Sequence, residues 1–260
     1  MHTTAAVHRR LVPTTEAASV VAALFVDELD CDGQGVAIPR PEVHLVARFG
    51  PSAHGGLDVH AFGGRQKVHR KLLRGGQRAV TVRLHLGAAA AVLGVPASAI
   101  AGQTVALEDL WGDAAARRLA DRLAGAGDTV AAARVLEAAI AGRGADAGRH
   151  GDRTRLVLDA ADRLTRAPVS AVAVDLGMSE RHLLRVFREA IGVGPKRFAT
   201  LMRFHRAVQA ARRDAGASWA SIAADAGYYD QAHLIAEFRA VAGVTPQMLL
   251  GELRATQSIG

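Results

Sequence analysis

Apolar and polar residues alternate over several short stretches in the first half of the chain. In residues 80–86 (VTVRLHL) every second residue is apolar, which is the pattern of a strand buried on one side. Residues 43–49 and 57–62 show a similar alternation, and turns rich in glycine, proline and serine separate these stretches. The first half therefore predicts several short strands.

The hydrophobic period changes to that of a helix after Trp111 and Gly112. Residues 113–124 and 128–141 carry large aliphatic side chains at helical spacing, and each stretch begins with an aspartate that can cap a helix. We expect these two helices to close an N-terminal domain of the α+β class.

Residues 141–151 (AGRGADAGRHG) separate the two halves. They contain four glycines and no apolar residue larger than alanine, and they show no hydrophobic period, which predicts a flexible linker. Beyond them the apolar residues recur at helical spacing and no alternating stretch is found. The sequence thus predicts a first domain over residues 1–140, a linker over 141–151 and an all-helical domain over 152–260.

The helical domain contains an internal repeat. An Ala-x-Asp-x-Gly pattern occurs at 173–177 and again at 223–227. The pairs His-Leu and Phe-Arg and the motif Gly-Val-x-Pro follow between 182 and 195, and they recur between 233 and 246. We interpret these as two copies of one structural unit, with one extra residue in the turn of the second copy.

Each copy has the features of a helix-turn-helix motif. In the first copy, Gly177 can adopt the left-handed conformation that ends a helix, and Ser179 can cap the next helix. One face of that next helix is apolar, and the opposite face carries three arginines and one leucine. A helix of this kind, held across a tight turn from its partner, fits the major groove of DNA. The outward residues are Arg181, Leu184, Arg185 and Arg188.

The charge of the chain favours a polyanionic partner. Its 260 residues include 32 Lys and Arg against 25 Asp and Glu, a formal net charge of +7. Residues 168–213 hold nine Lys and Arg against three Asp and Glu, whereas residues 214–260 hold two against five. We therefore expect the first copy to provide most of the attraction to phosphates, and the second to read DNA more weakly.

The motifs of the two copies resemble those of the AraC/XylS family of bacterial transcription regulators, over roughly residues 152–250. They include Ser-x-x-His-Leu-x-Arg-x-Phe at 179–187, Gly-Val-Gly-Pro at 192–195 and Gly-Tyr-Tyr-Asp-Gln-Ala-His-Leu at 227–234. The resemblance implies a homeodomain-like DNA-binding unit of seven helices, with two recognition helices that enter successive major-groove segments. In such regulators the first domain binds a small effector, dimerises, or does both.

The repeat and the resemblance together assign roles to individual residues. The residues expected near base edges are Arg181, Leu184, Arg185, Gln231 and Ala232. The residues expected at phosphates are Ser179, Arg188, Lys196, Arg197, Arg203 and Arg206. The alternative for the basic residues is a solvated helix face with no DNA contact.

Other kinds of function have less support in the sequence. The competing hypothesis is an alkyl-transferring repair enzyme with a similar DNA-binding domain, but such chemistry normally needs a set of cysteines. The single cysteine, Cys31, lies between two aspartates, which disfavours a reactive thiolate. The histidines of the first half lack the short paired spacing of a metal site, and no nucleotide-binding fingerprint is present. We therefore predict a protein that is not an enzyme and holds no metal or cofactor.

Several features bear on partners and location. No apolar run approaches the roughly 20 residues that span a bilayer, and the N-terminus lacks a signal-peptide pattern. We expect a cytoplasmic protein without membrane contact, whose main partner is double-stranded DNA. RNA polymerase, a small-molecule effector and a second copy of the chain are further candidate partners. The sequence leaves open the effector pocket, the operator and the choice between activation and repression.

Overall fold

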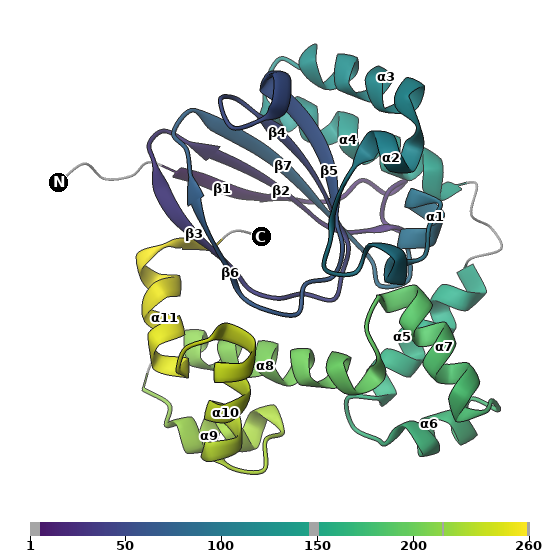
Figure 1. Ribbon diagram of the computed structural model, residues 1–260, viewed down its shortest axis with the longest axis vertical. Coiled ribbons are helices and arrows are strands. Elements are labelled where there is room, and N and C mark those ends of the chain that lie inside the picture. Colours follow the sequence, from purple (N-terminus) through teal and green to yellow (C-terminus); the bar gives the residue numbers. More distant parts are fainter. Residues whose placement is uncertain (1–5, 146–150, 215, 259–260) are drawn as a thin grey trace.

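The computed structural model describes residues 6–145, 151–214 and 216–258. It combines an N-terminal part built on β-sheets with a C-terminal set of helices (Figure 1). The strands of the first part are β1 (Ala6–Leu11), β2 (Val21–Leu29), β3 (Gly33–Ala37), β4 (His44–Phe49), β5 (Leu57–Phe62), β6 (His69–Leu73), β7 (Gln77–Leu84) and β8 (Thr104–Ala106). Its helices are η1 (His54–Gly56), α1 (Ala89–Leu93), η2 (Ala97–Ile100), α2 (Leu107–Trp111), α3 (Asp113–Ala124) and α4 (Thr129–Ala145).

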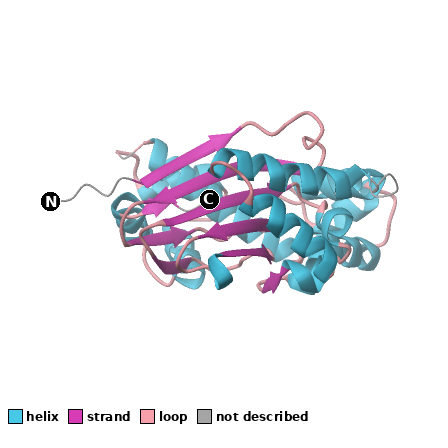
Figure 2. Cartoon of the chain, turned by 90° about the horizontal axis from the view of Figure 1, so that it is seen from above, coloured by secondary structure: helices cyan, strands magenta, loops and turns pink. Residues whose placement is uncertain are grey.

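Six antiparallel strands form the main sheet in the order β1-β2-β7-β4-β5-β8, and Figure 2 shows them side by side. Strands β4 and β7 pair so that Leu45 lies opposite Val82, and Val46 lies opposite Thr81. Because successive side chains of a strand point to opposite faces, these two pairs belong to different faces of the sheet. The face with Leu45 and Val82 packs on α3 and α4 and forms the larger hydrophobic core.

The second face of the main sheet lies opposite a smaller sheet with the order β6-β3-β9. Strand β9 (Gln257–Ser258) comes from the C-terminal end of the chain and pairs in parallel with β3. The first and last parts of the chain therefore share a sheet, and a cavity separates this sheet from the main one.

Seven helices follow, as the resemblance implies: α5 (Gly151–Arg163), α6 (Val169–Asp175), α7 (Glu180–Ile191), α8 (Pro195–Arg213), α9 (Trp219–Ala226), α10 (Gln231–Ala242) and α11 (Pro246–Ala255). Helices α6 and α7 form the first helix-turn-helix, and α9 and α10 form the second. Gly177 and Gly227 end the first helix of each pair with φ of 64° and 85°, as the repeat predicts. Helix α8 runs between the two motifs (Figure 1). The predicted α+β part and the helical part with its two helix-turn-helix motifs are thus both confirmed, except that the short strand β9 ends the part predicted to be all-helical.

The linker prediction is wrong at both of its ends. Helix α4 continues to Ala145, and α5 already begins at Gly151, so only residues 146–150 of the predicted linker stay outside the described structure. The helix persists because it packs on the core: a Cβ added at Gly144 would lie 2.7 Å from a methyl group of Val20. The cost of a glycine in a helix is modest, about 1 kcal/mol, so it does not prevent the helix from continuing where it lies this close to Val20.

The two parts of the chain also share a hydrophobic core. Val36 of β3 is buried together with Phe204 of α8 and Leu249 of α11. We expected two separate domains, but in this structure the two parts pack against each other. No helix in the described ranges is both long enough and apolar enough to cross a membrane.

Candidate nucleic-acid interface

Helix α7 presents the predicted reading face to solvent. The hydroxyl of Ser179 accepts a hydrogen bond from the backbone N–H of His182 at 3.2 Å, which caps the helix. Leu183, Val186 and Phe187 are buried against α5 and α6. Arg181, Leu184, Arg185 and Arg188 are all exposed on the other side. The structure therefore brings the four predicted residues of the first motif to one accessible face.

The arginines of this face are weakly held by the protein. Arg185 pairs with Glu189 one turn further along α7, with 3.3 Å between the guanidinium and the carboxylate. Both side chains keep substantial accessible surface, and exposed pairs at this spacing contribute only about 0.3–0.5 kcal/mol. Arg185 can therefore exchange this partner for a base edge at small cost.

The second motif exposes a smaller polar face. Asp230 caps α10 by accepting a hydrogen bond from the backbone N–H of His233 at 2.7 Å. Gln231 and Ala232 are exposed in the first turn, where they were predicted to lie. Next to them the ring of Tyr229 is 93% exposed, which the sequence reasoning did not single out. An exposed aromatic in a turn beside a helix N-terminus suits contact with a partner, and its place in the Gly-Tyr-Tyr-Asp motif was the available signal.

Three basic residues of α8 that were predicted at phosphates have protein partners. Arg197 donates to the side-chain oxygen of Gln66 at 3.1 Å and to its backbone carbonyl at 2.5 Å. Arg203 donates to Glu237 at 2.8 Å, and Arg206 donates to the carbonyl of Ala226 at 3.1 Å. All three side chains are half-buried. Their accessible surface therefore gives no support to the prediction that they contact phosphates.

Arg203 and Arg206 support the turn of the second motif. Glu237 of α10 accepts from Arg203 and also from the hydroxyl of Tyr228 at 2.8 Å. Burial, together with the hydrogen bond to Glu237, raises the pKa of Tyr228. The guanidinium of Arg203 lies 5.6 Å from the centre of the Tyr228 ring. Arg203 thus joins α8 to α10 and Arg206 joins α8 to the end of α9, so we assign both arginines a structural role. The remaining predicted phosphate contacts, Ser179, Arg188 and Lys196, are exposed.

The first motif also contacts the N-terminal part. A Cβ added at Gly192, at the end of α7, would lie 3.1 Å from the carbonyl oxygen of Ala97 in η2. The imidazole of His205 on α8 is buried and hydrogen-bonded through Nε2 to the carbonyl of Pro39. Burial and the positive charge of Arg40 lower the pKa of His205 to about 4, so the ring is neutral near pH 7. Helices α7 and α8 are thus held against the N-terminal part at several points.

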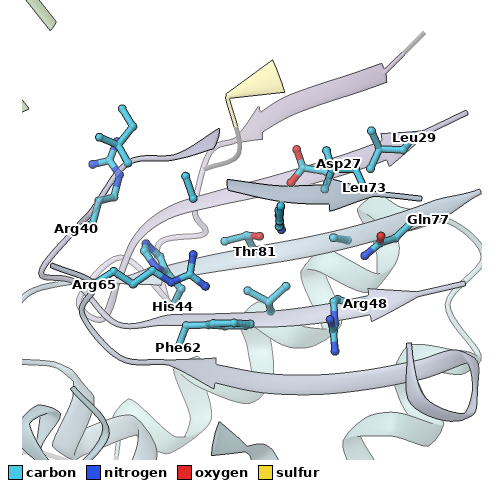
Figure 3. Close-up of a pocket in the computed structure, with 15 residues that line it drawn as sticks. Asp27, Leu29, Arg40, His44, Arg48, Phe62, Arg65, Leu73, Gln77 and Thr81 are labelled. Carbon is cyan, nitrogen blue, oxygen red and sulfur yellow. The ribbon is translucent and has the colours of Figure 1, made fainter. Parts of the chain in front are cut away.

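The N-terminal part contains a cavity of about 170 Å³ between the main sheet and strands β3 and β6 (Figure 3). Its walls combine basic and apolar side chains. The polar and charged residues that line it are Asp27, Arg40, His44, Arg48, Arg65, Lys71, Gln77 and Thr81. Sequence reasoning missed this site because its residues come from six different segments.

The described residues, 6–145, 151–214 and 216–258, contain no group of three or more His, Cys, Asp or Glu placed to hold a metal ion. Cys31 is exposed beside Asp30 and Asp32, in the turn that connects β2 and β3.

Comparisons with known proteins give one family match. Residues 172–251 match a family described as a helix-turn-helix domain. No curated protein matches the chain.

Several solved structures are similar to parts of the chain or to most of it. A DNA-binding transcriptional dual regulator from Escherichia coli K-12 is 26% identical over 38% of this chain and 89% of its own, with a TM-score of 0.32. ToxT from Vibrio cholerae O395 is 11% identical over 96% of this chain and 98% of its own, with a TM-score of 0.41. Wild-type ToxT from another Vibrio cholerae strain, bound to an unsaturated fatty acid, is 10% identical over 100% of this chain and 98% of its own, with a TM-score of 0.39.

The family match covers the turn of the first motif, α7, α8 and the whole second motif. It coincides with the repeat that the sequence shows and with the two capped helix pairs of the structure. Residues 172–251 therefore match the helix-turn-helix domain family, in agreement with the two helix-turn-helix motifs of the structure.

Proposed function

We propose that the protein is a sequence-specific transcription regulator in which α7 is the principal reading helix. The observation that carries the proposal is the exposed face of α7, where Arg181 and Arg185 stand one turn apart with Leu184 beside them. Bidentate contacts from arginine to guanine are the commonest specific contacts in the major groove. Leu184 is 41% exposed and offers an apolar surface to a thymine methyl group.

Phosphate contacts at both ends of α7 would fix this helix in the groove. Ser179 and the free N–H groups of the first turn form one anchor, because a helix N-terminus favours negative charge. Arg188 in the last turn and Lys196 at the start of α8 form the other, and both are exposed. Arg197 joins them only after it leaves Gln66 of the N-terminal part.

The second motif reads less of the sequence in this proposal. Gln231 and Ala232 occupy the first turn of α10, and Gln231 can pair with adenine. The rest of its outward face has Ala236 where α7 has Arg185, and the one arginine of α10, Arg239, is exposed in its last turn. In this proposal the second motif helps to position the protein on DNA and reads only part of the base sequence, with Tyr229 at the edge of its outward face.

Control of DNA binding by the N-terminal part is the finer element of the proposal. The contacts of Arg197 with Gln66 and of His205 with Pro39 connect the DNA-binding helices directly to that part. An effector or partner that shifts residues 39–66 would change both contacts. Activation and repression are both compatible with this arrangement.

The test is selection of bound duplexes from a random DNA library by the full chain, followed by binding of the selected site. We expect Arg185→Ala to lose about 1–3 kcal/mol of discrimination at one base pair. Arg117→Ala is the matched control, because Arg117 is also an exposed arginine in an i,i+4 pair but lies on α3 of the N-terminal part. An equal loss of affinity for all sequences would show that Arg185 contacts only phosphate.

A further inference from the structure

The cavity of the N-terminal part carries an excess of positive charge. Four cations line it, and Asp27 is the only acidic residue among its lining residues. Asp27 is already paired with His8 at 2.5 Å, and that hydrogen bond raises the pKa of His8. Arg48 is neutralised by a two-pronged pair with Asp58, at 2.8 and 2.7 Å. The charges of Arg40, Arg65 and Lys71 remain.

None of these three cations forms an ion pair with a carboxylate of the described residues, although the charge of Asp27 acts on Lys71 from a longer distance. The guanidinium of Arg65 lies 4.8 Å from the centre of the Phe62 ring, and Arg65 lines the cavity without a side-chain hydrogen bond to any described residue. Lys71 has accessible surface at the edge, yet burial and the charge of Arg65 lower its pKa. Glu42 is near Arg83 but does not line the cavity. An unneutralised group of cations in a partly enclosed space is costly unless an anion joins it.

His44 adds an unpaired polar atom to the same wall. Its Nε2 is inaccessible to solvent and has no hydrogen-bond partner. Burial and the charges of Arg83, Arg40 and Arg65 lower the pKa of His44 to about 3, so the ring is neutral. Figure 3 shows His44 and Arg65 side by side on the cavity wall, with Thr81 next to them. Buried polar atoms are rarely left unpaired, and a ligand polar group would satisfy this one.

The rest of the wall is apolar. Leu29, Phe62 and Leu73 line the cavity together with Ile38 and Val46. A volume of about 170 Å³ is comparable to the engineered cavity of about 150 Å³ that holds one benzene molecule. The occupant therefore has an anionic end and an apolar body no larger than one ring or a short chain.

We propose that this cavity binds a small organic carboxylate, whose anionic group lies between Arg40 and Arg65 and whose apolar body packs on Phe62 and Leu73. This site deepens the effector control proposed above and rests on it for its regulatory consequence. The cavity and helix α8 are connected through Pro39. Ile38 and Arg40, on either side of it, line the cavity, and its carbonyl accepts the hydrogen bond of His205 on α8. A carboxylate that draws Arg40 inward would move the residue that α8 contacts.

The binding test uses the full chain and pairs of probes with the same shape and different charge. Benzoate is compared with benzamide, and hexanoate with hexanamide, by calorimetry and by thermal unfolding. We expect at least one carboxylate to bind and to raise the unfolding temperature, and its amide to do neither. Loss of a charged hydrogen-bonding partner predicts that Arg65→Met weakens carboxylate binding by about tenfold or more.

Arg78→Met is the matched control for Arg65→Met. Arg78 also lies over an aromatic ring, 5.5 Å from the centre of Phe49, but it is exposed and does not line this cavity. Its substitution is expected to leave carboxylate binding unchanged. Without ligand, Arg65→Met is expected to raise the unfolding temperature, because it removes one of the repelling charges. This second readout does not depend on the choice of probe.

Three outcomes would overturn the site: no carboxylate binds, the amides bind equally well, or Arg78→Met weakens binding as much as Arg65→Met. DNA affinity measured with and without the carboxylate separates the site from the proposed function. If the carboxylate binds and DNA affinity is unchanged, the site is established and the link through Pro39 is refuted. If the carboxylate binds and the chain selects no DNA sequence, the site is established and the proposed function is refuted.

Discussion

Acidification is expected to destabilise the folded chain through His205. The ring of His205 is 8% exposed and lies between α8 and the Pro39 carbonyl, with the charges of Arg40, Arg83 and Glu42 nearby. Burial is the main cause of its low pKa, about 4, because the imidazolium form would lose its hydration. In the unfolded chain the pKa of histidine is about 6.5.

The sign and size of the effect follow from these two values. As the pH falls below 6.5, His205 becomes protonated in the unfolded state. In the folded state it stays neutral until the pH approaches about 4. The free energy of unfolding therefore decreases with acidification, by about 1.4 kcal/mol per pH unit in this window. Between pH 6.5 and pH 5 the loss from His205 is about 2 kcal/mol. His44, with a pKa of about 3, acts in the same direction.

Urea unfolding at pH 7 and pH 5 measures this loss. His205→Gln keeps an N–H donor for the Pro39 carbonyl and removes the titrating group, so we expect it to lose about 2 kcal/mol less than the original chain. His182→Gln is the control, since His182 is an exposed histidine on α7. If His205→Gln loses as much stability on acidification as the original chain, the buried neutral histidine is not the cause.

Two further stability predictions use matched variants. Gly142→Ala, with no heavy atom within 4 Å of the added Cβ, is expected to stabilise α4 by about 0.5–1 kcal/mol, whereas Gly144→Ala meets Val20 at 2.7 Å and is expected to destabilise it. Thermal unfolding of both variants checks this, and two neutral results would favour the flexible linker. Glu237→Gln is expected to cost about 1–3 kcal/mol in urea unfolding, because half-buried Arg203 keeps its charge without a carboxylate. Glu252→Gln, which breaks a more exposed pair with Arg70, is expected to cost less than about 1 kcal/mol, and equal costs would contradict the structural role of Arg203.

The C-terminal fold could be predicted because its signals are local. Gly177 and Gly227 end helices with positive φ, and Ser179 and Asp230 cap the helices that follow. Each signal acts within a few residues of the chain, so sequence spacing alone reveals it. Asp128 also caps as predicted, by accepting from the N–H of Ala131 at 2.7 Å, whereas Asp113 follows Gly112 and makes no cap.

The N-terminal part was predictable only in its central strands. Alternation located β4, β5 and β7, because the face of each that packs on the larger core requires apolar residues at every second position. The alternation did not predict strands β3 and β6, because β3 contains glycines and β6 contains charged residues. Their place depends on pairing between distant segments. Thr81, on the polar face of β7, is 5% exposed because these strands cover it, so the face expected to meet solvent became the wall of the cavity.

The phosphate assignment shows most clearly what local charge leaves undecided. The charges of α8 predicted a basic helix. In the structure, however, Arg203 donates to Glu237, 34 residues later in the chain, and Arg197 donates to Gln66, 131 residues earlier. The contact of Arg203 with Glu237 lies within the helical part, so a movement of that part as a whole does not break it. The second contact joins the helical part to the N-terminal part, so under the proposed function we expect Arg197 to reach a phosphate only when the two parts separate there. The proposed function therefore predicts that the affinity of α7 for DNA depends on the same interface that His205 and Pro39 form beside the cavity.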